Sequence, residues 1–381
     1  MGDYIKLDLI IDKKKNKKLY YNNKYLDSYK KDLDNFLSTE LSINNIDFAK
    51  KMLMNYELQA NNNIEGLVDS LESIDEVVNS KGKIIDYKDR KRIINLYKGY
   101  KYILQGKSIN KDNLRELYSL LSDDLLEKRD LNNMGAYYRK GPVYIIMGNR
   151  LDIDPIQGMP YKDLDFYMDN YFNYINKNNM NNDINNFIKS QIMHYYFVYV
   201  HPFFDVNGRT SRTVSMWYLL NSKNYPYIVF NRAISYAKSG YDKTINKCRD
   251  RGEVTLFLEY MLSQVLKELE KESLIQNINI NNCLNLSIEE EQIIEYFINM
   301  NGNLTAIDLI RKYNEYNFKV KPKIIYINKI EPLIDKGIFK IEGYTKKNIC
   351  EDVPNMWLKL NSKYVNMDKK KLKYLKIDKY I

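Results

Sequence analysis

Two apolar segments of this chain are joined by the sequence His201-Pro-Phe-Phe-Asp-Val-Asn-Gly-Arg-Thr-Ser-Arg212. Residues 187–200, which precede it, are apolar and aromatic over several helical turns, and residues 213–221 resume the apolar pattern after it. Because proline disfavours helical conformation in the residue before it, the first helix is expected to end before Pro202. The sequence therefore predicts a helix, a tight loop and the N-terminus of a new helix near Gly208.

The start of the second helix has the features of a phosphate site. A helix N-terminus offers unbonded N–H groups and the positive end of the helix dipole, and Asn207-Gly208 allows the backbone to come close to an anion. Arg209 and Arg212 are three positions apart, so both project on one side of the helix and can hold separate phosphate oxygens. The loop is therefore predicted to bind a nucleotide phosphate.

The same loop carries a candidate metal ligand and a candidate base. Mg²⁺ bound to phosphates usually takes one or two protein carboxylates, which fits Asp205 among these cations. His201 has an ordinary pKa of about 6.5, which suits a general base near neutral pH. A lone histidine beside an apolar helix is more often a packed core residue, but this chain has only 2 His. The other, His194, lies earlier on the same predicted helix and is expected to be a core or supporting residue.

The loop resembles the motif of the Fic family, His-Pro-Phe-x-Asp/Glu-Gly-Asn-Gly-Arg-x-x-Arg. Every fixed position is matched except the first glycine, which is Val206 here. The resemblance implies a protein adenylyltransferase that moves AMP from ATP, with Mg²⁺, to a Ser, Thr or Tyr hydroxyl of a protein target or of its own chain. A β-branched residue disfavours positive φ, so the peptide at Val206 is expected to be either ordinary or strained, and activity is expected to survive it.

The resemblance also implies a role for each matching position. His201 would be the catalytic base and Asp205 the metal ligand. A tyrosine lining the adenine pocket is common in the family downstream of the motif, and Tyr241 is the best positional match, with ordinary packing as the alternative. The nucleotide-binding residues implied in this way are Val206, Asn207, Gly208, Arg209, Arg212 and Tyr241.

An upstream segment, Asn61-Asn-Asn-Ile-Glu65-Gly66, resembles the inhibitory motif of Fic proteins, Ser/Thr-x-x-x-Glu-Gly/Asn, with Asn61 in place of the hydroxyl residue. Asparagine can still accept a hydrogen bond, so the change is mild. The resemblance implies that Glu65 pairs with Arg212 and removes the partner of the γ-phosphate of ATP. A glutamate near a helix end is otherwise commonly just exposed.

Residues 143–147 form an apolar extended run before a turn signal at Gly148-Asn149. In Fic proteins a hairpin here, the flap, aligns an extended segment of the target through backbone hydrogen bonds. We expect Ile145 to be the flap residue that holds the target. The alternative is an ordinary surface hairpin.

Composition and apolar spacing divide the 381 residues into several regions. We expect a mainly α protein, with a Fic-type helical core, a small β-hairpin flap and a C-terminal winged helix-turn-helix domain. The predicted regions are a helical N-terminal part with the inhibitory motif (1–110), the catalytic core (111–270), a linker (271–286), the winged helix-turn-helix domain (287–365) and a charged, solvated tail (366–381).

The predicted winged helix rests on local signals. Ser287 and Glu290 form a capping-box pattern, Thr305 precedes a second helix, and residues 323–336 and 338–360 indicate a third helix and two strands. Lysines at 321, 323 and 329 would lie on or before the third helix, as a DNA-reading helix requires. Such domains also serve as dimer or target-docking modules, so a homodimer is an alternative.

The net charge of +10 permits nucleic acid as a partner. The abundance of Lys, Asn, Ile and the 35 Tyr suggests a codon bias, which weakens that argument. Three widely spaced Cys fit a reduced, cytoplasmic chain, and no signal peptide or membrane span is expected.

Two other functions remain open at this stage. A Fic enzyme can use another donor and transfer UMP or phosphocholine, or a γ-phosphate, although the phosphate-transferring branch carries Lys where this chain has Gly208. The second alternative is a nucleotide-sensing, DNA-binding transcription regulator whose winged helix is the active part.

Overall fold

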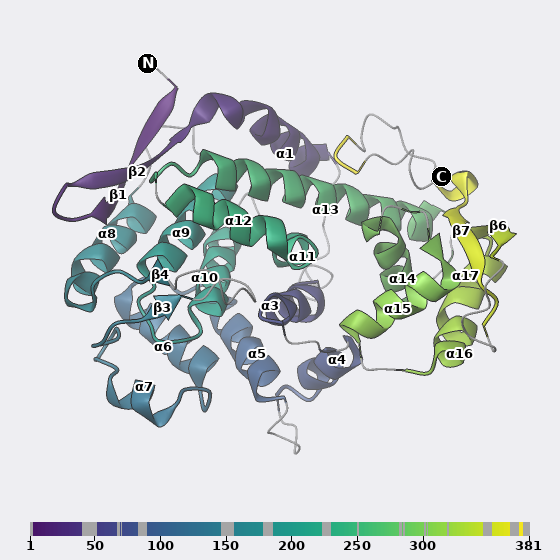
Figure 1. Ribbon diagram of the computed structural model, residues 1–381, viewed down its shortest axis with the longest axis horizontal. Helices are drawn as coiled ribbons and strands as arrows, with labels where there is room; N and C mark the ends of the chain where they lie inside the picture. Colours follow the sequence, from purple (N-terminus) through teal and green to yellow (C-terminus); the bar gives the residue numbers. More distant parts are fainter. Residues whose placement is uncertain are drawn as a thin grey trace. The chain divides into compact units, whose positions relative to one another are not determined.

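The described part of the chain is mainly helical and carries small antiparallel sheets (Figure 1). The computed structural model divides into two units, one of Met1–Gly66 with Glu72–Gln264 and one of Leu67–Leu71 with Val265–Ile381. The structure describes residues 3–39, 52–66, 69, 71–82, 90–145, 156–177, 186–222, 230–249, 251–281, 284, 286–300, 302, 304–317, 320–345, 353–365 and 373–375.

The first unit contains two β-hairpins and a group of helices. Its elements are β1 (Tyr4–Asp12), β2 (Lys17–Asn22), η1 (Asn23–Tyr25), α1 (Asp27–Thr39), the π-helix η2 (Met52–Glu57), α3 (Leu58–Ile64), α4 (Leu71–Asn79), α5 (Lys91–Ile103), α6 (Lys111–Ser122), α7 (Lys128–Asn132), β3 (Tyr144–Ile145), β4 (Ile156–Gln157), η3 (Tyr161–Asp163), α8 (Leu164–Asn176), α9 (Asn186–Val200), α10 (Asn207–Asn221), α11 (Phe230–Ser235), α12 (Lys238–Arg249) and the start of α13 (Thr255–Asn281).

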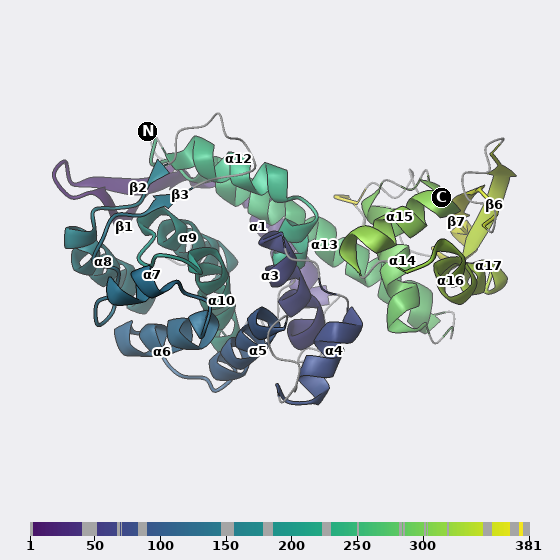
Figure 2. The ribbon, with the colours of Figure 1, turned by 60° about the horizontal axis from the view of Figure 1, so that its bottom comes forward.

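Helices α9 and α10 form the centre of this unit, where they pack side by side (Figure 2). Helix α8 packs on α9, while α5, α6 and α3 pack on α10. Almost every residue of α9 is buried, which is why its sequence is apolar around the whole helix and not along one stripe. The predicted motif therefore joins two largely buried helices.

A β-hairpin formed by β1 and β2 stands where the sequence analysis expected only helices. The strands pair antiparallel, with Tyr4 opposite Asn22. Along β1 the side chains of Leu7, Leu9 and Ile11 are buried at every second position, and the strand packs on α8. This alternation is the period of a half-buried strand, so the local signal was present in the sequence.

The second unit contains helices and a three-stranded sheet with the order β5-β7-β6. Ser287 and Glu290 form the capping box that their spacing predicts, and Thr305 caps the next helix with Asp308 as its partner. The elements are α14 (Ile288–Asn299), β5 (Leu304–Thr305), α15 (Ala306–Tyr316), α16 (Pro322–Ile325), the π-helix η4 (Tyr326–Ile330), α17 (Glu331–Asp335), β6 (Phe339–Tyr344), β7 (Met356–Leu360) and η5 (Ser362–Tyr364).

The segment predicted as a linker, 271–286, is helical for most of its length, because α13 continues to Asn281. Leu274, Ile275 and Ile278 are buried there. Lys271 is also buried and forms ion pairs with Glu268 at 2.6 Å and with Glu295 of α14 at 2.9 Å. The abundance of asparagine made the helical pattern of this segment weak, and the helix is stabilised by contacts distant in sequence.

The predicted solvated tail is also wrong where the structure describes it, at residues 373–375. The side chain of Leu375 is buried. The carboxylate of Glu270 on α13 accepts hydrogen bonds from the backbone N–H groups of Tyr374 at 2.8 Å and Leu375 at 2.7 Å. Two backbone bonds to one carboxylate hold this segment against the helix despite its neighbouring lysines.

Among the helices that the structure describes, none has the length and apolar character required to cross a membrane.

Leu274→Ala should lower the free energy of unfolding by about 3 kcal/mol, because it leaves a cavity in a packed helix. We expect Ile324→Ala, at a side chain that is 46% exposed in the same unit, to change it by less than about 0.5 kcal/mol. Urea denaturation followed by far-UV circular dichroism measures both. An unchanged midpoint for Leu274→Ala would contradict the packing of this side chain in the core of the unit.

Candidate functional site

The loop between α9 and α10 is held in shape by its own side chains. The side-chain amide of Asn207 donates to the carbonyl oxygen of Phe203 at 2.9 Å and accepts from the N–H of the same residue at 3.0 Å. The ring of Phe203 stacks on Tyr118 of α6 with 3.6 Å between ring centroids. The side-chain amide of Asn207, which was predicted to hold phosphate, is thus engaged within the loop. Only the backbone N–H of this residue is left to bind an anion.

Val206 adopts the strained one of the two backbone conformations expected for it. Its φ is 64° and its ψ is 11°, which is the left-handed region, and it caps α10 without a side-chain hydrogen bond. This conformation costs a β-branched residue roughly 1–2 kcal/mol. Its side chain is buried, and that burial offsets part of the strain.

His201 lies at the C-terminal end of α9, also with a positive φ, of 56°. Its Nδ1 lies 3.4 Å from the carbonyl oxygen of Val198, which can only accept, so Nδ1 carries the proton and Nε2 keeps its lone pair. Burial lowers the pKa of His201 to about 4; Arg139 and Arg249 lower it further, while the Val198 carbonyl and Glu65 oppose them. The imidazole is therefore neutral at pH 7 and able to accept a proton.

Arg209 is a buried cation without a partner for most of its donors. Its side chain is 5% exposed, and Nε and Nη1 have no hydrogen-bond partner in the part of the chain that the structure describes. Burial lowers its pKa, against the carboxylates Glu65 and Asp205. A buried guanidinium with unused donors is costly unless an anion binds there. The exposed Asp205 accepts a hydrogen bond from the N–H of Val206 at 2.6 Å.

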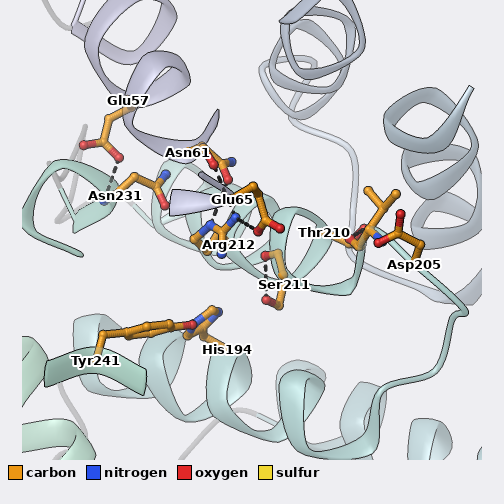
Figure 3. A network of polar contacts seen from close by, with 12 residues as sticks. Glu57, Asn61, Glu65, His194, Asp205, Thr210, Ser211, Arg212, Asn231 and Tyr241 are labelled. Carbon is orange, nitrogen blue, oxygen red and sulfur yellow. Dashed lines mark hydrogen bonds and ion pairs between the residues drawn. The ribbon is translucent and has the colours of Figure 1, made fainter. Parts of the chain in front are cut away.

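Arg212 lies in a polar network with Glu65 and Asn61 of the segment that resembles the inhibitory motif (Figure 3). Its Nη2 donates to Glu65 Oε1 at 2.5 Å and its Nε donates to Asn61 Oδ1 at 2.8 Å. Burial would raise the pKa of Glu65, but Arg212, with Arg209 and Lys238, outweighs that and holds the pKa below its ordinary value. Glu65 is therefore ionised at neutral pH.

This carboxylate lies over the first turn of α10. A Cβ atom at Gly208 would be 2.8 Å from Glu65 Oε1 and 3.1 Å from Arg212 Nη1. A side chain at this position would therefore displace the ion pair. An ionised carboxylate lies at the helix N-terminus where the sequence predicts a phosphate.

Tyr241 and His194 lie on the other side of Arg212 (Figure 3). Both are buried, and the hydroxyl of Tyr241 is 2.6 Å from Nε2 of His194. Burial, helped by the cation of Arg212, lowers the pKa of His194 to about 3, and burial raises the pKa of Tyr241. The structure thus places Tyr241 beneath the arginine with its hydroxyl engaged by a core histidine, and its contact with adenine stays a prediction.

The predicted flap is present as a short antiparallel pair, with Ile145 of β3 opposite Ile156 of β4. The side chain of Ile145 is 8% exposed, whereas that of Tyr144 is 59% exposed. Residues 146–155, which include the predicted turn at Gly148-Asn149, lie outside the described residues. The side chain that this strand offers to a partner is therefore Tyr144, and Ile145 packs inward.

Two residues that the sequence analysis did not single out hold the site together. Glu57 is buried and accepts hydrogen bonds from the backbone N–H groups of Asn231 at 2.9 Å and Arg232 at 3.1 Å, at the start of α11. Arg139 is buried beside the loop and donates to the carbonyl oxygen of His201 at 2.9 Å. Neither had a local motif, and only three-dimensional neighbours reveal them.

Residues 108–219, which include this loop, match the model of the Fic/DOC family. The chain is similar to Protein adenylyltransferase Fic from Drosophila mojavensis, at 28% identity over 172 residues, which cover 44% of this chain and 32% of the relative. The aligned part thus spans about a third of the relative's length.

The fold of this chain is similar to the crystal structure of a Fic family protein from Desulfovibrio desulfuricans G20. The TM-score is 0.56 at 16% identity, and the similarity covers 88% of this chain and 96% of the other. At this identity the likeness concerns the fold alone.

The residues present fit a Mg²⁺ ion that is shared with phosphates. Among the described residues, no group of three or more His, Cys, Asp or Glu could hold a metal by itself. Asp205 is one exposed carboxylate at the end of the loop, close enough to Arg209 to act on its pKa. Mg²⁺ often takes one carboxylate, phosphate oxygens and water, so the donor set suits it.

The imidazole of His201 should titrate with a midpoint near pH 4, because burial and two arginines penalise its charged form. The chain has only 2 His, so histidine-selective NMR resolves both, and His201→Ala assigns the signals. His194 should not titrate above about pH 4. Since both pKa values lie below the unfolded value of about 6.5, stability should be full above pH 6.5 and fall as the pH drops toward 4. A His201 midpoint between pH 6 and 7 would contradict this.

Proposed function

We propose that this protein is a Mg²⁺-dependent protein adenylyltransferase, which moves AMP from ATP to a Ser, Thr or Tyr hydroxyl of a protein. The observation that carries the proposal is the buried, largely unpartnered guanidinium of Arg209, on the helix that follows the neutral His201. A triphosphate supplies the anion that this cation lacks, and the histidine supplies the base. The Gly208-Arg209 pair and the relative's name favour AMP over other transferred groups.

In this mechanism the hydroxyl oxygen of the target attacks the α-phosphorus of ATP. Its proton passes to Nε2 of His201, whose other nitrogen is held by the carbonyl of Val198. The bond from the α-phosphorus to the bridging oxygen breaks, and pyrophosphate leaves. Arg209 and the backbone N–H groups at the start of α10 hold the phosphate oxygens, where the helix dipole favours negative charge.

Asp205 is the residue that would hold Mg²⁺. When bound, the ion neutralises phosphate charge and orients the chain of phosphates. The carboxylate of Asp205 is exposed, and its hydrogen bond from Val206 leaves further lone pairs for a metal ion.

Glu65 would inhibit the reaction. Its ionised carboxylate takes Arg212 and lies over the first turn of α10, where phosphate oxygens would otherwise bind. Like charge repels the triphosphate from this position, and Arg212 is not available to the γ-phosphate. ATP then binds only in a pose in which the target hydroxyl is not aligned with the bond that must break.

The flap strand β3 would align the target. The two residues of β3 pair with the two residues of β4. An extended peptide could add to the edge of this pair by backbone hydrogen bonds. Because Ile145 is turned inward, the exposed Tyr144 is the better candidate for contact with the target side chains.

The second unit supports a winged helix-turn-helix as our proposal for residues 287–365. The order α14, β5, α15, then α16 to α17, then β6 and β7 is that of such a domain. Lys321 and Lys323 are exposed at the start of its third helix, which favours DNA binding as a second candidate function. Ile324 and Ile327 are exposed on the same segment and would suit a protein partner instead.

Glu65→Gly should raise the rate of AMP transfer at least tenfold, because it frees Arg212 and the helix N-terminus. Intact-mass measurement after incubation with ATP and Mg²⁺ detects AMP on the chain itself and on added protein targets. Glu127→Gly, at an exposed side chain of 76%, is the matched control and should behave like the parent. EDTA, or His201→Ala in the Glu65→Gly background, should abolish the signal.

Two results of that experiment would contradict the proposal. A gain of UMP or another group in place of AMP would assign a different donor. No covalent gain with any nucleotide, in any variant, would favour a sensor that binds nucleotide without transfer.

If the second unit reads DNA, Lys321→Gln with Lys323→Gln should weaken duplex binding and reduce the dependence of log K on log salt by about two. Fluorescence anisotropy over a salt series measures this, with Lys14→Gln and Lys15→Gln, both exposed in the first unit, as the control. Absence of duplex binding at low salt, or binding that ignores the first pair, removes DNA as the partner of this helix.

A further inference from the structure

Arg139 joins the flap to the motif loop through its buried side chain. Its Nε donates to the carbonyl oxygen of His201 at 2.9 Å, Nη1 to that of Gly141 at 2.6 Å and Nη2 to that of Met159 at 2.6 Å. Its backbone N–H donates to the carbonyl oxygen of Pro202 at 3.1 Å. The reaction proposed above gives this residue no role.

The three acceptors belong to three different parts of the site. Gly141 precedes β3, Met159 follows β4, and His201 is the proposed base. The backbone adds two further links, from the N–H of Gly158 to Val143 at 3.0 Å and from the N–H of Met159 to Val200 at 3.3 Å. One guanidinium therefore fixes both ends of the flap and the residue that carries the imidazole.

The guanidinium of Arg139 is hydrogen-bonded to carbonyl oxygens and has no acidic partner among the described residues. Among the described residues it forms no ion pair, and burial lowers its pKa to about 10. A buried cation that contacts only neutral oxygens is costly, and an apolar side chain would fill the same space at lower cost. The planar fork of arginine, however, reaches three carbonyl oxygens in fixed directions, which lysine cannot do.

The surroundings of Arg139 leave little freedom. His201 keeps a positive φ of 56°, a conformation that persists only when its neighbours determine it, and its carbonyl points at Arg139. At Gly158 a Cβ atom would be 2.7 Å from Val143, 3.1 Å from Nη2 of Arg139 and 3.4 Å from Cβ of His201. Val143, the guanidinium of Arg139 and the Cβ atom of His201 thus all lie close around Gly158.

We propose that Arg139 is a positioning residue that sets the distance between the flap and the imidazole of His201, so that a target peptide held on the flap presents its hydroxyl to Nε2. This rests on the proposed function of the site. It explains why the acceptors of one side chain are the two ends of the flap and the base, and why the side chain is a fork.

Arg139→Gln in the Glu65→Gly background should lower kcat for a protein target about 100-fold and raise its KM, because a displaced base loses alignment with the hydroxyl. The Kd of ATP, measured by calorimetry, should change by less than about twofold, since Arg209 and the α10 backbone are untouched. Arg139→Lys should not restore kcat. Arg129→Gln, at an arginine that is 78% exposed, should leave all three unchanged.

Two measurements test the link without any transfer reaction. Hydrogen exchange at Gly158 and Met159 should become at least tenfold faster in Arg139→Gln and in Arg139→Lys, but not in Arg129→Gln. The His201 midpoint in histidine NMR should rise in Arg139→Gln, which removes a cation, and stay low in Arg139→Lys. If the Glu65→Gly protein transfers nothing, the proposed function fails, while these results still decide whether Arg139 couples flap and base.

Two outcomes would overturn the proposal. The first is a parallel loss of kcat, ATP affinity and thermal stability in Arg139→Gln, which would make the residue a general support of the fold. The second is unchanged exchange at Gly158 and Met159 with unchanged kcat. If Arg139→Gln does not fold, Gly158→Ala replaces it, because the added methyl group pushes on the guanidinium without removing it. Slower transfer at unchanged ATP affinity in this variant supports positioning. Unchanged transfer opposes it.

Discussion

The chain must pass from α9 to α10, two largely buried helices that pack on each other, within a few residues, and this constraint shapes the site. The turn from α9 to α10 needs a positive φ at both His201 and Val206. The backbone of Phe203 is bound on both sides by the amide of Asn207, and its ring is stacked on α6. These contacts fix the loop that connects His201 to the N–H groups at the start of α10 before any ligand binds.

Two buried arginines one turn apart on α10 create the electrostatic problem of the site. The charge of Arg212 is neutralised by Glu65, and Asn61 accepts a further hydrogen bond from it. Arg209 keeps N–H donors without hydrogen-bond partners among the described residues. A polyanion would neutralise both arginines, whereas the carboxylate of Glu65 neutralises only Arg212. Competition between Glu65 and phosphate oxygens for the same helix end is therefore a direct consequence of this arrangement.

Sequence reasoning identified the loop between α9 and α10 and the extended run at β3, because each is a local pattern. The pairing of Glu65 with Arg212 joins distant residues, and it followed from the resemblance of residues 61–66 to an inhibitory motif. Sequence reasoning also placed the capping box at Ser287 and the helix start at Thr305 correctly. It missed features that depend on distant contacts, such as the burial of Leu274 on α13 and the docking of Leu375 on Glu270. Arg139 and Glu57 had no local signal, since their partners are backbone atoms far away in the sequence.

The proposed inhibitory segment is more than a single carboxylate. Glu57, Asn61 and Glu65 are four positions apart, so they lie on one face of η2 and α3. Glu57 binds the start of α11, Asn61 binds Arg212 and the hydroxyl of Tyr100 on α5, and Glu65 binds Arg212. Substituting Glu65 frees the arginine but leaves the other two contacts of this face in place. A natural signal that relieves inhibition would have to displace Glu65 locally, at the end of α3, or break the buried contacts of Glu57 and Asn61 together, which costs far more.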